Sequence, residues 1–498
     1  MREDLASPSA AIRPRALTRV LPLIAGLAAA AWGLWHFAVA VHDLYGALVI
    51  DDAYITFRYA ENWANGYGPT WNPGEPPVEG YSTPLLMALL AAGGVAGIPV
   101  VSFAKAIGVA SAVATLGMTG ALAWCATRSL AWPLLAVGVL AANPVHAVWA
   151  VSGMETSLYT ALVVGAGLGL ASALAAPASC SRWGVVGVLL ALLALTRSEG
   201  LLFAAGLGLL LVGERAEPLP ARRVAAVLAA VAVVALVHLA LRRWYYGLFL
   251  PLPMYEKGRP FAGVPIVTSF LAMYWVYLVP GAMAVLVERR GASAQALRFG
   301  AIALALLCVV VLNVDPVMSN WQRYHAPMLP FVVVTALVGL RHLGRLAPRL
   351  LVVPAVLAAV LVARGEYAIG ASREHLLGEV RDYDRWVTMG HVALGHWLAA
   401  HVPDRNATLA LCDSGVVPYY SRLRVIDLWG LNDAYIARHG VEPDYVFGKR
   451  PELIVLSPMP PDEPLRHDPR LASDYVPVRE FDSLYVLELY RRRDYTLR

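Results

Sequence analysis

Residues 50–84 read IDDAYITFRYAENWANGYGPTWNPGEPPVEGYSTP and form the first long polar interval after an apolar segment. The interval opens with two adjacent carboxylates, Asp51 and Asp52, and is dense in aromatic residues, glycine and proline. The chain around it is strongly hydrophobic, and a pair of carboxylates beside a membrane costs free energy. Such a pair therefore indicates a function. This interval is therefore the centre of the candidate site.

The composition is that of a membrane protein. Of the 498 residues, 58% are hydrophobic and 15% are charged, whereas a soluble domain carries about 25% charged residues. The net charge of +5 does not indicate a nucleic-acid partner, because the basic residues mostly occupy short loops between apolar runs, as membrane orientation requires. We predict a polytopic protein surrounded by membrane lipids.

About eleven apolar runs are predicted to cross the membrane. They are residues 20–41, 101–127, 129–150, 156–176, 184–197, 199–213, 224–241, 266–287, 299–313, 327–340 and 350–364. The first is long for a signal peptide and is interpreted as a retained span. A further run, 85–98, is too short to cross and is predicted to be half-inserted or to lie on the surface.

The positive-inside rule predicts the orientation. Arginines in the segment 1–19 place the N-terminus in the cytoplasm, and the arginines of later short loops fall on the same side if 85–98 does not cross. We therefore expect a cytoplasmic segment (1–19), a membrane domain (20–365) whose loop 42–84 is extracytoplasmic, and a soluble extracytoplasmic domain (366–498).

The residues after 366 have the composition of a soluble domain. Residues 374–401 have the apolar spacing of an amphipathic helix. Short β-rich runs follow, separated by glycine and proline, at 408–412, 423–428, 453–457 and 484–489. The predicted fold class is mostly α, a polytopic membrane protein with a C-terminal α/β domain.

Asp51 and Asp52 have two interpretations that the residues leave open. A carboxylate at the edge of a low-dielectric cavity can act as a general base or hold a metal. Alternatively, the pair caps a helix that begins near Tyr54. Arg58 lies farther along the same predicted helix and would pair with a carboxylate or meet an anionic substrate.

The rest of the loop is suited to a sugar. Trp71, Glu79 and Tyr81 combine aromatic rings with a carboxylate, and sugars have apolar faces and hydrogen-bonding edges. An ordinary ordered loop is the alternative. Glu155 and Glu199 are acids at the membrane edge on the same predicted face, where Arg197 would pair with Glu199.

Basic residues also occur on the predicted outer face, where few are expected. They are Arg242, Arg243, Lys257 and Arg323, with Tyr246 and Tyr324 beside them. A lipid phosphate at the interface is the natural partner, and an aromatic belt with snorkelling arginines is the alternative. No Walker loop, dinucleotide fingerprint or HExxH motif is present, so ATP-driven transport, dinucleotide chemistry and zinc hydrolysis lack support.

Several of these motifs resemble one family. The stretch DDAYITFRYAENWANGYGPTWNPGEPPVEGYSTPLL is similar to the first extracytoplasmic loop of GT-C membrane glycosyltransferases, above all the mycobacterial terminal arabinofuranosyltransferases and their bacterial relatives. Further similar motifs follow in the family's order: SGMETSLYTAL, LTRSEGLLF, RRWYYGLFLPLPMYEKG, QRYHAPMLP and DSGVVPYYSRLRVIDLWGLNDAYIA. The chain departs from the family at Pro251-Leu252-Pro253, where Pro-Asn is usual, and at Arg197-Ser198-Glu199, where Arg-Pro-Glu is usual.

The resemblance implies an inverting glycosyltransferase of a bacterial inner membrane. The donor would be a sugar on polyprenyl phosphate, and arabinofuranose is one candidate sugar. The acceptor would be a cell-envelope glycan or a lipid at the outer face. On the family's pattern the catalytic base is Asp51, with Asp52 beside it, and Lys257 occupies a donor-phosphate position.

A mechanism follows from these expectations. Asp51 would deprotonate an acceptor hydroxyl while basic residues stabilise the leaving phosphate. That phosphate is already anionic, so no cofactor is required, and a divalent metal is not indicated. Two other classes stay open: a lipid or glycan transporter, which would distribute charged residues along a path through the spans, and a non-catalytic protein that binds envelope components.

Overall fold

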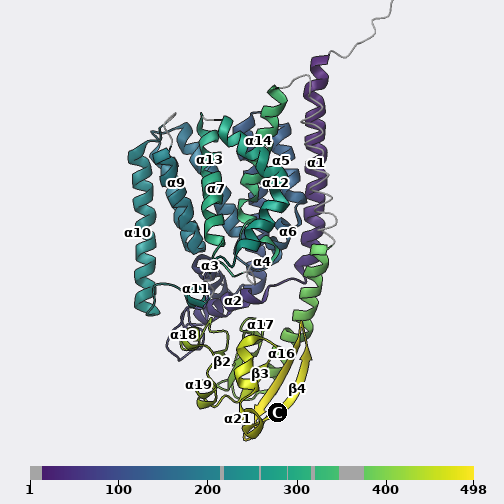
Figure 1. Ribbon diagram of the computed structural model, residues 1–498, viewed down its shortest axis with the longest axis vertical. Coiled ribbons are helices and arrows are strands. Elements are labelled where there is room, and N and C mark those ends of the chain that lie inside the picture. Colours follow the sequence, from purple (N-terminus) through teal and green to yellow (C-terminus); the bar gives the residue numbers. More distant parts are fainter. Residues whose placement is uncertain (1–13, 214–217, 257–259, 289, 316–319, 347–374) are drawn as a thin grey trace, which may run out of the picture.

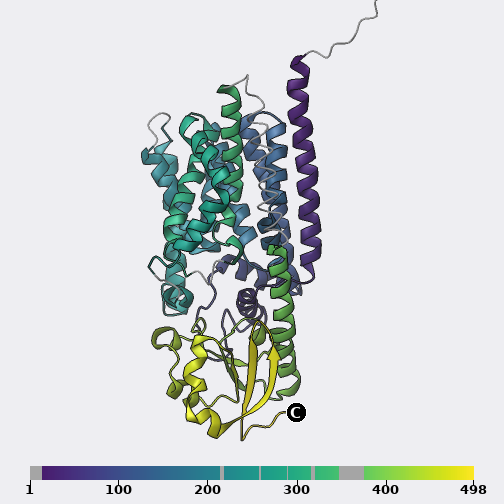
Figure 2. The ribbon, with the colours of Figure 1, turned by 45° about the vertical axis from the view of Figure 1, so that its right-hand side comes forward.

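The computed structural model describes residues 14–213, 218–256, 260–288, 290–315, 320–346 and 375–498. A bundle of long helices makes up most of it, and a smaller domain built on a β-sheet lies at one end (Figure 1). Helix α1 (Pro14–Tyr45) begins at the opposite end of the bundle. After a turn of the molecule by 45° the sheet domain still lies beyond the same end (Figure 2).

Seven helices in the described part of the chain are long and apolar enough to cross a membrane. They are α1, α4 (Val100–Thr127), α7 (Thr156–Ala175), α10 (Ala221–Tyr245), α12 (Val264–Val287), α13 (Ala292–Val311) and α14 (Leu329–Leu346). Helices α5 (Ala131–Ala142) and α6 (Pro144–Val151) form an apolar pair bent by 63°. The bend falls at Pro144, which lacks an N–H for the helix, and the Asn143 side chain caps the second half by accepting from Val145 N at 3.0 Å.

These helices confirm most of the predicted spans. The long helices and the bent pair coincide with eight of the predicted runs, and the runs 184–197 and 199–213 form the shorter helices α8 (Cys180–Thr196) and α9 (Leu201–Gly213). The last predicted run, 350–364, lies outside the described residues. The fold class, a mostly helical membrane protein with a C-terminal sheet domain, is confirmed.

Three shorter helices lie at the end of the bundle that faces the sheet domain (Figure 1). They are α2 (Asp51–Ala64), α3 (Pro84–Val95) and α11 (Leu252–Glu256). Helix α3 has twelve residues, whereas about twenty are needed to cross a bilayer. Helix α2 is buried along the run 53–60, because it lies between the bundle and the sheet domain.

The sheet domain begins with a helical segment, 375–401, that includes the π-turn η6 (Thr388–Val392) and α16 (Ala393–His401). Its five-stranded sheet has the order β2-β1-β3-β5-β4. Strands β1 and β3 pair in parallel, β1 and β2 likewise, and β5 runs antiparallel to both of its neighbours. The strands are β1 (Thr408–Leu411), β2 (Arg424–Asp427), β3 (Leu453–Leu456), β4 (Tyr475–Asp482) and β5 (Val486–Arg492), and the helices between them are α17 (Val416–Ser421), α18 (Ile436–His439), α19 (Pro443–Gly448), α20 (Glu463–Arg466) and α21 (Pro469–Asp474).

The four predicted β-runs are confirmed as β1, β2, β3 and β5, whereas β4 was not predicted. Strand β4 lies at the sheet edge, contains Pro477 beside an irregularity in its pairing, and exposes half of its residues. Proline and charge are tolerated at such an edge, and they hide the apolar alternation that marks a strand.

Candidate active site

The two adjacent carboxylates at the start of α2 point to different surroundings. Successive side chains on a helix are about 100° apart, because a turn takes 3.6 residues. Asp52 lines a cavity between α2 and the bundle. Asp51 is absent from that lining among the described residues and bonds to the sheet domain instead, accepting from Val416 N at 2.8 Å.

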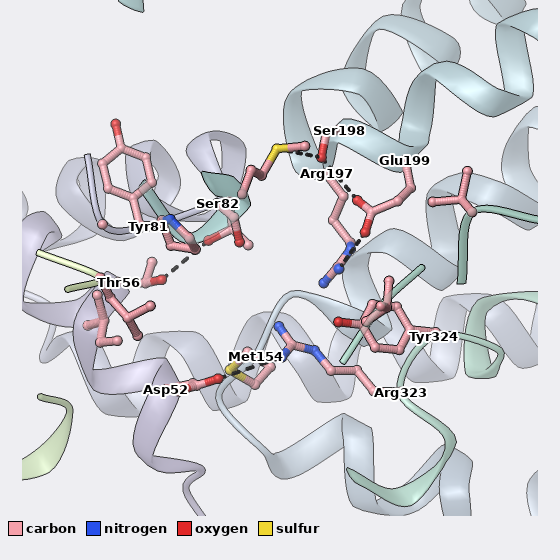
Figure 3. A pocket seen from close by; sticks show the side chains of 18 of the residues that line it. Asp52, Thr56, Tyr81, Ser82, Met154, Arg197, Ser198, Glu199, Arg323 and Tyr324 are labelled. Atoms are coloured by element: carbon pink, nitrogen blue, oxygen red, sulfur yellow. Dashed lines mark hydrogen bonds and ion pairs between the residues drawn. The ribbon is translucent and has the colours of Figure 1, made fainter. Parts of the chain in front are cut away.

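The cavity has a volume of about 390 Å³ and joins segments that are far apart in the chain. The polar residues of its lining include Asp52, Thr56, Ser82, Arg197, Glu199, Arg323 and Tyr324 (Figure 3). The apolar residues of its lining include Leu202, Pro253, Met254, Val310, Val314 and Leu431. A cavity lined by both charged and apolar side chains suits a ligand that joins a polar head to a hydrocarbon chain.

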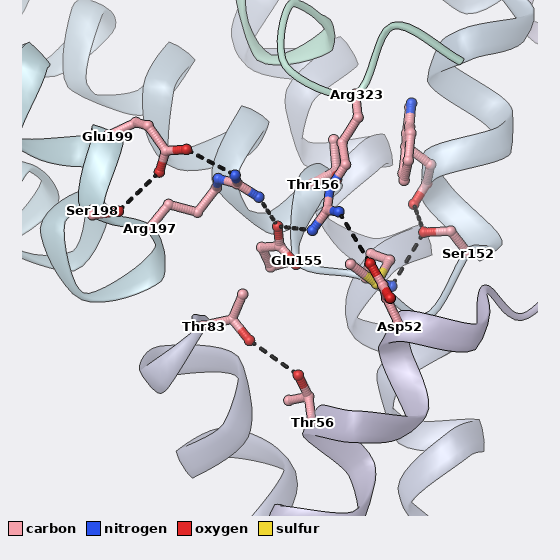
Figure 4. Close-up of polar contacts among 12 residues, drawn as sticks. Asp52, Thr56, Thr83, Ser152, Glu155, Thr156, Arg197, Ser198, Glu199 and Arg323 are labelled. Carbon is pink, nitrogen blue, oxygen red and sulfur yellow. Dashed lines mark hydrogen bonds and ion pairs between the residues drawn. The ribbon is translucent and has the colours of Figure 1, made fainter. Parts of the chain in front are cut away.

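Two arginines of the cavity lining meet at one buried carboxylate. Arg197 and Arg323 both donate to Oε1 of Glu155, which is 1% exposed, and the distance from Arg323 Nη2 is 3.2 Å. Arg197 also donates to Glu199 at 2.9 Å, which confirms the predicted pair. Figure 4 shows the two guanidinium groups converging on Glu155 from opposite sides.

Asp52 is the carboxylate that faces this arginine pair from α2. Its Oδ2 lies 3.8 Å from Arg323 Nη1, the longest of the contacts that Arg323 makes with acids. The Asp52 side chain is 34% exposed, so it can be reached from the cavity. A carboxylate beside an arginine and open space can take a proton from a hydroxyl group that enters the cavity.

The backbone is irregular at Arg197 and immediately before Arg323. Arg197 is extended between α8 and the short turn that begins α9, with φ −150° and ψ 148°. Arg323 follows Trp321 and Gln322, both left-handed with φ 44° and 59°. The left-handed conformation costs free energy in residues other than glycine, and it persists only when other contacts hold it. Here the Trp149 indole donates to Trp321 O at 3.0 Å.

Asp51 belongs to a polar cluster at the junction with the sheet domain. Its backbone N–H donates to the Tyr383 hydroxyl at 2.9 Å, and its carboxylate lies against Gly415, where a Cβ would come within 2.3 Å of Oδ2. Burial raises the pKa of Asp51 to about 7, although nearby His391 acts in the opposite direction. Asp51 therefore anchors the sheet domain on the start of α2.

His391 and Asp413 complete this junction cluster. His391 lies 3.0 Å from Asp413 Oδ2 and 2.8 Å from the Ser483 hydroxyl, and Tyr485 donates to the same Asp413 oxygen at 2.5 Å. Burial by itself lowers the pKa of His391, but Asp413 outweighs burial and raises that pKa above its usual value. Burial by itself would raise the pKa of Asp413, but the hydrogen bond from His391 outweighs burial, so the pKa of Asp413 is lowered.

Two of the predicted ligand-binding residues lie at the same junction rather than in the cavity. Arg58 is 6% exposed and donates to the carbonyls of Trp71, Pro418 and Leu423 at 3.0, 2.7 and 2.8 Å. Its guanidinium lies 4.5 Å from the Trp71 ring centroid, and Trp71 is 1% exposed. Every one of these contacts joins the first loop to itself or to the sheet domain.

The remaining predicted residues divide between the cavity and its surroundings. Tyr81, Arg323 and Tyr324 line the cavity. Glu79 pairs with buried Arg242 at 3.0 Å, Tyr246 donates to Pro69 O at 2.9 Å, and exposed Arg243 donates to Gly247 O at 3.0 Å. Lys257 lies outside the described residues.

Some of the cavity residues were not predicted as ligands. Arg197 was expected only to neutralise Glu199, and Thr56 and Ser82 were not singled out. The available signal was the position of Arg197 and Glu199 between two short apolar runs on the predicted outer face. No group of three or more His, Cys, Asp or Glu side chains within the described ranges is arranged to hold a metal ion.

Comparisons with known proteins bear on the sheet domain and on the whole fold. A family model described as a domain of unknown function (DUF8728) matches residues 379–498. No curated protein matches the chain.

Solved structures match nearly the whole chain. The apo structure of ArnT from Cupriavidus metallidurans is 14% identical, with a TM-score of 0.64, over 93% of this chain and 98% of that one. ArnT bound to undecaprenyl phosphate is 15% identical, with a TM-score of 0.58, over 95% and 98%. The archaeal oligosaccharyltransferase AglB from Archaeoglobus fulgidus, in complex with an inhibitory peptide and a dolichol-phosphate, is 12% identical, with a TM-score of 0.55, over 85% and 69%.

These similarities define the class of fold. The chain has the GT-C fold of ArnT and AglB. At identities of 12–15% the similarity defines the fold alone.

Proposed function

We propose that the protein is an inverting glycosyltransferase that moves a sugar from a polyprenyl-phosphate carrier to a hydroxyl of an acceptor. One observation carries the proposal: Asp52, Arg197 and Arg323 line one cavity together with a set of apolar side chains, and Asp52 lies beside Arg323. The undecaprenyl phosphate bound to ArnT and the dolichol-phosphate bound to AglB support the same class of donor.

The proposed reaction needs a base and a cationic site. Asp52 removes the proton from the acceptor hydroxyl, and the acceptor oxygen forms a bond to the anomeric carbon of the donor sugar. The bond between that carbon and the phosphate oxygen breaks, and polyprenyl phosphate leaves with the bonding electron pair. Arg197 and Arg323 stabilise the charge that develops on this phosphate, and fixed charges of this kind commonly supply a large part of catalysis.

Asp52 takes the role that the sequence resemblance implied for Asp51. The carboxylate of Asp51 accepts from the backbone of the sheet domain, whereas that of Asp52 is open to the cavity. We propose arabinofuranose or another pentose or hexose as the donated sugar, a cell-envelope glycan or lipid as the acceptor, and the outer face of a bacterial inner membrane as the place of transfer.

The test uses the purified full chain in detergent with a panel of polyprenyl-phosphate-linked monosaccharides and envelope-derived acceptors. Asp52→Asn is expected to lower kcat by about a hundred- to ten-thousand-fold, the usual contribution of a general base. Asp51→Asn is the matched control and should stay within about tenfold of wild type. Full activity of the Asp52→Asn protein would exclude Asp52 as the base, and no transfer from any such donor would favour a transporter or a binding protein.

A further inference from the structure

Glu155 has a place in the site that neither its sequence motif nor the proposed reaction explains. It does not belong to the described lining of the cavity, and it is 1% exposed at the start of α7. Yet one oxygen of its carboxylate accepts from both cavity arginines, Arg197 and Arg323. A buried carboxylate shared by two guanidinium groups is costly to desolvate, so its geometry has a strong effect on both partners.

The two arginines come from distant and irregular parts of the chain. Arg197 lies between α8 and α9, and Arg323 follows the left-handed residues Trp321 and Gln322. Without a common acceptor, the two positively charged guanidinium groups would repel each other, and their long side chains would sample many rotamers. Glu155 reduces both effects, because it accepts from one Nη atom of each guanidinium, and both arginines line the cavity.

The other acids at the site do not hold both arginines. Glu199 binds Arg197 at 2.9 Å, and Asp52 lies 3.8 Å from Arg323. Arg323 Nη1 faces Asp52 and the cavity, whereas Nη2 is held by Glu155 at 3.2 Å. An incoming phosphate can therefore take Nη1 from Asp52 without releasing Arg323 from Glu155.

We propose that Glu155 is a positioning residue that holds Arg197 and Arg323 as a two-guanidinium clamp for the phosphate of the lipid carrier. This inference rests on the proposed function for the identity of the phosphate. It predicts that the charge and reach of the Glu155 side chain determine the affinity for the lipid phosphate, although Glu155 itself does not touch it.

The test measures binding of undecaprenyl phosphate to the purified full chain in detergent, separately from transfer. Glu155→Gln keeps the shape and removes the charge, and it should weaken binding about tenfold or more. Glu155→Asp keeps the charge but shortens the reach, so an intermediate affinity is expected. Glu452→Gln is the matched control, because Glu452 bridges Arg492 and the Thr408 backbone within the sheet domain and should leave binding unchanged.

The outcomes separate this inference from the proposed function. Wild-type affinity in both Glu155 variants, or loss of the same size in Glu452→Gln, would overturn the clamp. No binding of undecaprenyl phosphate by the wild-type chain would overturn it as well. If undecaprenyl phosphate binds to the wild type and binds less tightly to the Glu155 variants, but no sugar is transferred from any donor, the clamp is supported and the proposed function is contradicted. If Glu155→Gln does not fold, Glu155→Asp together with Arg197→Lys still tests whether affinity follows the guanidinium geometry.

Discussion

At the scale of single residues, the site depends on which of two adjacent acids faces the cavity. Asp51 and Asp52 have the same side chain, but the carboxylate of Asp51 accepts from Val416 N and that of Asp52 lies near Arg323. The same distinction applies to the arginines. Arg58 donates to buried carbonyls at the junction, whereas Arg197 and Arg323 line the cavity.

Arg323 offers a prediction at this scale. Arg323→Lys should raise the donor KM by about tenfold or more, because an ammonium group lacks the planar fork that reaches Glu155 and a phosphate at once. Arg405→Lys is the control, since Arg405 donates to two carbonyls in the sheet domain. Steady-state kinetics with varied donor measure the effect. An unchanged donor KM in Arg323→Lys would argue against phosphate binding by Arg323.

At the scale of elements, the start of α2 is held between the bundle and the sheet domain. The Tyr383 hydroxyl accepts from the Asp51 N–H, and the Asp51 carboxylate lies against Gly415. His391 and Asp413 follow on the domain side. The orientation of α2, and with it the direction of Asp52, is therefore set by a junction that contains several titratable groups.

The junction predicts a dependence of stability on pH. The folded protein raises the pKa of Asp51 from 3.8 to about 7, so it binds more protons than the unfolded chain between these values. Stability from this group is present below pH 4 and is lost as the pH rises through 7, and the raised pKa of His391 acts in the same direction. The apparent Tm in detergent should therefore fall between pH 5 and pH 8. Over this range Asp51 should lower the free energy of unfolding by an amount on the order of 1 kcal/mol.

Asp51→Asn isolates the group responsible. The variant should show a weaker decline of Tm over this pH range, because the amide does not titrate and its oxygen can still accept from Val416 N. Asp404→Asn is the control, since Asp404 is exposed on the sheet domain and should retain the wild-type slope. A slope in Asp51→Asn equal to that of the wild type would contradict this account of the junction.

At the scale of the whole molecule, the first loop joins the helix bundle to the sheet domain. Arg58 provides much of this connection through its bonds to Trp71, Asn72, Pro418 and Leu423. The cavity lies on the bundle side of the same loop and takes Leu431 from the sheet domain as part of its wall. The sheet domain is therefore part of the site's architecture.

Arg58 tests this connection. Arg58→Ala should lower the free energy of unfolding by roughly 2–4 kcal/mol, because it removes four buried hydrogen bonds, two of which reach the sheet domain. Thermal unfolding in detergent and limited proteolysis at the junction measure the loss. Arg422→Ala is the control, because the Arg422 side chain is 67% exposed and makes a surface pair with Glu61, which should contribute little. Equal effects of the two substitutions would contradict the assigned role of Arg58.

The sequence by itself determined the architecture at low resolution. Apolar runs of sufficient length predict α1, α4, α7, α10, α12, α13 and α14, since the thickness of a bilayer requires that length. The short run before α4 was correctly expected to be too short to cross. The four β-runs of the C-terminal domain were also correct, and β4 was not predicted because edge strands tolerate Pro477 and charged residues.

Only the tertiary structure decided how the charged residues are assigned. A sequence shows that Asp51 and Asp52 are adjacent, but the side that each faces depends on the rotation of α2, and that rotation is set by contacts with residues more than 300 positions away. The convergence of Arg197 and Arg323 on Glu155 likewise joins three separate segments. Hydrophobic length is a local property that the sequence displays, whereas the partner of a buried charge is a long-range property that folding alone creates.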